Sequence, residues 1–155
     1  MEFIRRFVKD RSGFVTLFVL LYCLIAFAGL VSEYFRIIDL RQEAENILQR
    51  GVNEAVDDML RDSYRRDFAA RVDAIAVVQR FDNYLRNQAN LDSMNRRVTR
   101  DGTEVWRVEF TNVLASPDEA SLTVKGIIRT RSIISILTGD IEFPFSISSR
   151  AIRLD

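Results

Sequence analysis

Histidine is absent from the 155 residues of this chain, and cysteine occurs once, as Cys23. One thiol and no imidazole exclude a disulfide within one subunit, a His/Cys metal site and a Cys–His nucleophile pair. A glycine-rich phosphate-binding loop is also lacking. The acidic pairs Asp57–Asp58 and Asp118–Glu119 do not resemble convergent carboxylates, because neighbouring helical side chains diverge and the second pair lies in a turn signal. We therefore expect no enzyme, no metal and no other cofactor.

An excess of charge of either sign is lacking as well. The chain has 22 basic and 22 acidic residues; the first twelve residues contribute four basic and two acidic ones, so the remainder carries a net charge of −2. A generally basic nucleic-acid-binding surface is therefore not indicated. A DNA-capturing module remains as an alternative that would depend on arginines of the sheet region. The candidates for one strand face are Arg129, Arg131, Arg150 and Arg153.

Proline is missing between Met1 and Ser116, so no residue of that type interrupts a helix there. Within this region, the run from Ser12 to Ser32 has no charged side chain. A helix from Gly13 to Val31 would be about 29 Å long, which matches the roughly 30 Å hydrocarbon core of a bilayer. We therefore predict a transmembrane helix over residues 13–32.

The basic residues before this run predict its orientation. Residues 1–12 form a basic tip, and lysine and arginine beside a first span hold that side in the cytoplasm. Residues 33–155 are then extracytoplasmic, as a single domain. A cleaved signal peptide is the alternative. The apolar run is longer than the 7 to 15 residues usual for a signal peptide, and no convincing Ala-x-Ala site follows it.

Beyond the span, helical periodicity gives way to alternation, which predicts an α+β domain. We expect a long amphipathic helix over about 33–60, a break at 61–66 with Asp62 or Ser63 as the next cap, and a second helix over about 64–89. A small three- to four-stranded antiparallel sheet should follow, with Trp106 on its outer face. Its strands are expected at about 104–113, 121–130 and 141–154, with a short leading strand at 96–99 before an Asp101-Gly102 hairpin turn.

This layout resembles that of type IV pilin-like proteins. The residues concerned are Arg11-Ser12-Gly13, the apolar helix that begins Phe14-Val15-Thr16-Leu17-Phe18, its amphipathic extension to Leu60, and the terminal Phe145-Ser146-Ile147-Ser148-Ser149-Arg150-Ala151. Most similar are the TadE-like minor pseudopilins of Tad (tight adherence) pili. The resemblance implies a structural subunit of a filament or of a related secretion system. Its partners would be other pilin-like subunits or a second copy, the lipid bilayer and an inner-membrane assembly platform.

One position departs from the processed type IV pilins. The resemblance implies cleavage by a prepilin peptidase between Gly13 and Phe14, and a glutamate at the fifth position of the product. That position is Phe18 here, and the nearest acid is Glu33, beyond the span. Two alternatives therefore remain, an uncleaved membrane-anchored pseudopilin and a processed minor pilin.

The function expected of a pilin-like chain is assembly by helix packing. Small residues at Ala28, Gly29 and Ser32 offer a strip for close helix approach, although small residues in a lipid-facing helix would give the same pattern. The amphipathic stripe continues this face, and either the chain's own sheet or a partner helix could cover it. This stripe consists of Ile37, Leu40, Ala44, Ile47, Leu48 and Gly51. A further alternative is a single-pass subunit whose outer domain docks on another membrane complex.

Overall fold

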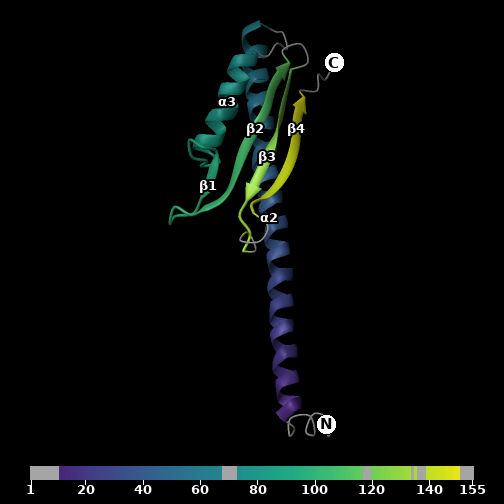
Figure 1. Cartoon of the computed structure of the whole chain (residues 1–155). Helices are drawn as coiled ribbons and strands as arrows, with labels where there is room; N and C mark the ends of the chain where they lie inside the picture. Colours follow the sequence, from purple (N-terminus) through teal and green to yellow (C-terminus); the bar gives the residue numbers. More distant parts are fainter. Residues whose placement is uncertain (1–10, 68–72, 117–119, 134, 136–138, 151–155) are drawn as a thin grey trace. The chain divides into compact units, whose positions relative to one another are not determined.

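The computed structural model describes residues 11–67, 73–116, 120–133, 135 and 139–150. The chain divides into two compact units, Met1–Ile38 and Asp39–Asp155. Over these described residues the fold is α+β, with two helices followed by four antiparallel strands, as the sequence predicts (Figure 1).

Helix α2 is one uninterrupted α-helix, Arg11–Asp67, of 57 residues. The predicted break at 61–66 is therefore wrong, as are Asp62 and Ser63 as caps. Residues 61–66 contain neither proline nor glycine, and polar side chains by themselves do not end a helix.

Helix α3 begins ten residues later than predicted, at Ala74, and ends at Asn87. Its cap is Asp73, whose carboxylate accepts hydrogen bonds from the backbone N–H groups of Ile75 at 2.9 Å and Ala76 at 3.4 Å. A side-chain oxygen at this position satisfies N–H groups that have no partner inside the helix. Residues 68–72, where the predicted helix would have passed, lie outside the described residues.

The sheet has the order β1-β2-β3-β4, and every neighbouring pair is antiparallel. Strand β3 has the predicted bounds, whereas β2 is three residues longer than expected. The part of the last predicted strand at 151–154 lies outside the described residues. The four strands are β1 (Arg96–Val98), β2 (Glu104–Ser116), β3 (Ser121–Thr130) and β4 (Ile141–Arg150).

Trp106 corrects the sequence prediction, because its side chain is wholly buried rather than on the outer face. Alternation from Trp106 carries Val108 and Phe110 to the same inner face of β2. A β-bulge between Phe110 and Asn112 then shifts the register, so that Val113 lies opposite the buried Val124 of β3.

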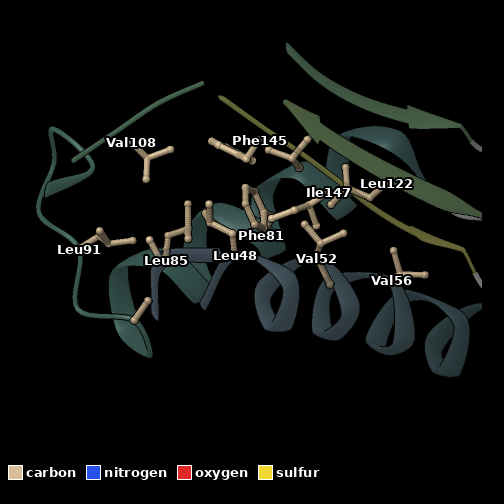
Figure 2. Close-up of a cluster of buried hydrophobic side chains, with 14 of the residues drawn as sticks. Leu48, Val52, Val56, Phe81, Leu85, Leu91, Val108, Leu122, Phe145 and Ile147 are labelled. Atoms are coloured by element: carbon tan, nitrogen blue, oxygen red, sulfur yellow. The ribbon is translucent and has the colours of Figure 1, made fainter. Parts of the chain in front are cut away.

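The core of the second unit lies between one face of the sheet and the helices α3 and α2, the latter contributing residues from Ala44 to Met59 (Figure 2). Aromatic rings connect these layers, since Phe110 is 5.8 Å from Phe81 of α3 and 6.3 Å from Phe145 of β4 between ring centroids. Each wholly buried large side chain contributes about 1.5–3 kcal/mol of transfer free energy. The largest of them are Trp106, Leu48, Leu85, Leu122, Ile128, Val52, Val56, Val77, Val108 and Val124.

Candidate assembly surface

Helix α2 contains a candidate membrane span, which is long and apolar enough to cross a bilayer. None of the most apolar window of this helix is buried within the chain. Its side chains are exposed on every side of the helix, so the described part of the chain leaves this segment uncovered. The exposed large apolar residues are Phe14, Val15, Leu17, Phe18, Val19, Leu20, Leu21, Tyr22, Leu24, Ile25, Phe27, Leu30, Val31, Tyr34 and Phe35.

The small-residue strip of the predicted assembly face lies in this uncovered segment. Ala28, Gly29 and Ser32 are all exposed. A Cβ atom added to Gly29 would meet nothing within 4 Å. Contacts within the described chain therefore do not account for glycine at this position.

The outer part of the predicted face is used by the chain's own fold. Ala44, Leu48 and Gly51 are buried, and Leu40 and Ile47 are half-buried against the core. For these five residues, the structure shows packing within the chain. Ile37, in the first unit, is half-buried.

Gly51 shows why a small residue stands in the middle of α2. A Cβ atom there would lie 2.6 Å from Cδ1 and 2.9 Å from Cε1 of Tyr84, and 3.2 Å from Cε2 of Phe81. The glycine thus permits the close approach of α3 to α2. The sequence pattern placed Gly51 in the predicted assembly face. In the structure, a glycine is required there by the contact between α2 and α3.

The predicted cleavage site lies within the helix. The Gly13–Phe14 bond is in the first turn of α2, and the ring of Phe14 lies 4.9 Å from that of Phe18. Phe18 therefore packs against the residue that would become the N-terminus of a processed product. No carboxylate occupies either position.

Glu33, the nearest acid to the span, is paired with Arg36. Its two carboxylate oxygens accept hydrogen bonds from Nε and Nη2 of Arg36, both at 2.7 Å. A bidentate pair of this kind is strong and directional. In the sequence, Glu33 is the first acid after Phe18, and its three-residue spacing to Arg36 is the signal for this pair.

A groove of about 250 Å³ lies between α2 and α3. Burial and the nearby Glu54 raise the pKa of Tyr84 at its wall, while Arg50 opposes them. Among the described residues, no group of three His, Cys, Asp or Glu side chains could hold a metal ion. The groove is lined by Glu54, Ala55, Asp58, Arg80, Asn83, Tyr84, Asn87 and Gln88.

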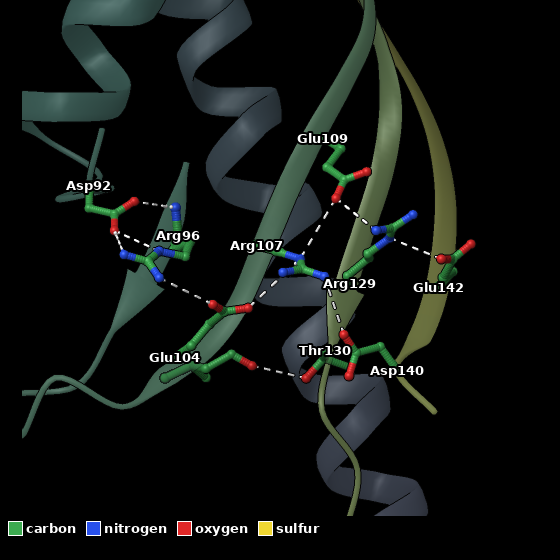
Figure 3. A network of polar contacts seen from close by, with 10 residues as sticks. Asp92, Arg96, Glu104, Arg107, Glu109, Arg129, Thr130, Asp140 and Glu142 are labelled. Atoms are coloured by element: carbon green, nitrogen blue, oxygen red, sulfur yellow. Dashed lines mark hydrogen bonds and ion pairs between the residues drawn. The ribbon is translucent and has the colours of Figure 1, made fainter. Parts of the chain in front are cut away.

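The face of the sheet opposite the core carries a network of ion pairs (Figure 3). Arg129 lies 2.8 Å from Glu109 and 2.9 Å from Glu142. Arg107 lies 3.3 Å from Asp140 and 3.7 Å from Glu109. Four carboxylates thus surround two guanidinium groups, with Glu104 as the fourth at 3.9 Å from Arg107.

This arrangement weakens the case for a DNA-binding strand face. Arg129 is already paired with two carboxylates, whose charge would repel phosphate. Arg150 is paired with Ser121 at the other end of the β3–β4 ladder, about eight residues or roughly 26 Å from Arg129. The two arginines therefore do not form one patch. Arg131 is exposed beyond the end of β3, and Arg153 lies outside the described residues.

Comparisons of this chain with protein-family models, with curated proteins and with solved structures find no match. The class that the fold defines is an α+β chain with, in the part that the structure describes, one candidate membrane span in α2.

Proposed function

We propose that this chain is a single-pass, membrane-anchored structural subunit of pilin-like (pseudopilin) type, which assembles through helix packing. The N-terminus lies in the cytoplasm and the second unit is extracytoplasmic, in accord with the basic residues that precede the span. The system served is a type IV filament, a Tad-like pilus or a related secretion complex. This function is not enzymatic.

One observation carries the proposal: a single 57-residue helix is uncovered and apolar in its first part and built into a core in its later part. Such a helix combines a membrane anchor with an element of the second unit's core. Because the apolar stripe of α2 from Ala44 to Met59 is buried in the chain's own core, apolar helix packing between subunits would use the earlier part of the helix. The strip of Ala28, Gly29 and Ser32 is suited to it, since small residues let two helix backbones approach closely.

Docking of the outer domain on another membrane complex is the second candidate. It is favoured by the network of Arg107 and Arg129, because a face of paired charges suits a reversible contact with another soluble surface better than a permanent apolar interface. The two functions differ in where the contact lies, in the span or on the outer domain.

Disulfide cross-linking in the span tests the proposal. In a Cys23→Ser background, we expect Ala28→Cys and Ser32→Cys to form disulfide-linked dimers in membranes treated with a permeant copper oxidant, as seen on non-reducing gels. Leu30→Cys is the matched control. Leu30 is exposed at similar depth, but it lies about 200° around the helix from both positions.

Equal cross-linking at all three positions would indicate random collision and contradict a specific helix face. A lack of cross-linking at all three would favour the docking function. In that case, cysteines on the outer face of the sheet should cross-link to another membrane protein.

A further inference from the structure

The segment that directly follows the predicted span is more apolar than its charges suggest. Tyr34 and Phe35 are 63% and 59% exposed, and their rings contact each other edge to face at 5.8 Å between centroids. Both lie in the first unit, on the same helix as the span. Both rings lie just beyond Ser32, where the predicted span ends.

The two charges of this segment neutralise each other. Glu33 and Arg36 form the bidentate pair described above, with both hydrogen bonds at 2.7 Å. A paired carboxylate and guanidinium cost less free energy to bring into a medium of low dielectric constant than two separate ions do. The segment can therefore approach lipid without an isolated charge.

The length of the helix brings this segment to the edge of the bilayer. Counted from Gly13, Phe35 lies about 33 Å along the helix, just beyond the roughly 30 Å hydrocarbon core and within the 40–45 Å that include the headgroups. At this depth, tyrosine and other amphipathic aromatic side chains are enriched, because the ring contacts acyl chains while the hydroxyl contacts water.

We propose that Tyr34 and Phe35, together with the Glu33–Arg36 pair, form an interfacial anchor that lies in the lipid headgroup layer. The partner of this surface is the bilayer itself. The anchor fixes the depth of this segment of α2 in the bilayer. This proposal rests on the membrane span of the proposed function.

Spin labels measure this depth in the full-length chain, reconstituted in vesicles of phosphatidylcholine and phosphatidylglycerol. Labels are placed at Tyr34→Cys and Phe35→Cys in a Cys23→Ser background. The native Cys23 serves as the deep reference, and Asp57→Cys, exposed on α2 of the second unit, serves as the aqueous reference. Collision rates are measured with oxygen, which enters the bilayer, and with a water-soluble nickel chelate.

We expect collisions with the nickel chelate at positions 34 and 35 to be several-fold fewer than at Asp57 and more frequent than at Cys23. Oxygen collisions should stay high. Nickel collisions as frequent as at Asp57 would overturn the interfacial anchor. Low collision rates with both reagents would also overturn it, because another protein would then cover the rings. If Cys23 itself is open to the nickel chelate, the span fails and the proposed function with it.

A second measurement tests the function of the anchor rather than its depth. In the Tyr34→Ser/Phe35→Ser variant, we expect the label on Cys23 to shift in depth, since the helix has lost its aromatic contacts with the headgroups. Ile75→Ser is the matched control, because Ile75 is an apolar side chain, 71% exposed, in the second unit. An unchanged depth of Cys23 in the aromatic variant would contradict the anchor.

Discussion

At the scale of single residues, two glycines in the same helix have opposite surroundings. Gly51 faces Tyr84 and Phe81 within 3.2 Å of an added Cβ, whereas Gly29 faces open space. Glycine in a helix costs about 1 kcal/mol relative to alanine. At Gly51, the close approach of α3 offsets this cost, and at Gly29 only a contact outside the described chain could do so.

This difference predicts opposite effects of the same substitution. Gly51→Ala should lower the free energy of unfolding of the second unit by about 1–2 kcal/mol, because the strain of overpacking exceeds the gain in helix propensity. Gly29→Ala should not lower it. Urea unfolding of the full chain in detergent micelles, followed by the fluorescence of the buried Trp106, measures both. An unchanged or higher urea midpoint for Gly51→Ala would show that Tyr84 moves aside freely.

At the scale of elements, the connection from α3 to β1 is held by Asp92. One carboxylate oxygen accepts hydrogen bonds from the backbone N–H groups of Met94 at 2.9 Å and Arg96 at 2.8 Å, and the other lies 2.7 Å from Nη2 of Arg96 (Figure 3). From α3, the guanidinium of Arg86 donates to the backbone carbonyl of Asp92 and to the side chain of Asn95. These contacts fix the chain reversal in which Asn95 has a positive φ of 57°.

The contacts of Asp92 make this connection dependent on pH. The side chain of Arg96, and then the backbone N–H groups of Arg96 and Met94, lower the pKa of Asp92. A lowered pKa in the folded state stabilises the protein above the unfolded value of about 3.9, and this contribution disappears as the pH falls through the folded value. Asp92→Asn should therefore be less stable than the natural chain at neutral pH, and the difference should shrink as the medium is acidified below about pH 4.

Urea midpoints across this pH range check the prediction. Asp57→Asn, which replaces an exposed acid on α2, is the control for general effects of charge. A difference between Asp92→Asn and the natural chain that stays constant down to the lowest pH would contradict a role for the ionised carboxylate.

The elements also show how far the sequence determines this fold. Strand β3 was predicted with its observed bounds, because regular alternation is flanked there by clear turn signals. The end of α2 was not predictable, since residues 61–66 are compatible with a helix and the next cap, Asp73, is decided by the start of α3. For β2, Val105 and Trp106 are adjacent apolar residues, and only the packing of the domain decides which of them faces inward.

The same limit applies to the candidate site. Leu48 and Gly51 would form an apolar stripe whether the chain's own core or a partner helix covered them, so periodicity could not separate these cases. The pair of Glu33 and Arg36 and the adjacent rings of Tyr34 and Phe35 follow from spacing along one helix. Both features could have been predicted from the sequence if the interpretation had not stopped at Glu33, the first charged residue after the span.

At the scale of the whole molecule, the second unit has a hydrophobic core of its own, and its sheet face is occupied by paired charges. Among the described residues, most of the exposed large apolar side chains belong to the first unit. If subunits assemble by apolar contact, the candidate span in α2 therefore offers the surface for it. Whether residues 1–13 are cleaved off or retained then determines the N-terminus of the helix that takes part in assembly.

The absence of a carboxylate at Phe18 predicts that the chain stays uncleaved. Cleavage after Gly13 would place a new charged amine on Phe14 beside Phe18, without an acid to neutralise it inside an apolar bundle. The intact mass of the chain, purified from membranes of cells that contain a prepilin peptidase, should therefore correspond to a start at Met1.

Gly13→Ala is the control and should leave the start of the natural chain unchanged. A mass that begins at a methylated Phe14, and that returns to Met1 in Gly13→Ala, would establish the processed minor pilin instead. A start beyond the span, after Ser32, would show a cleaved signal peptide and exclude both forms of the anchored subunit.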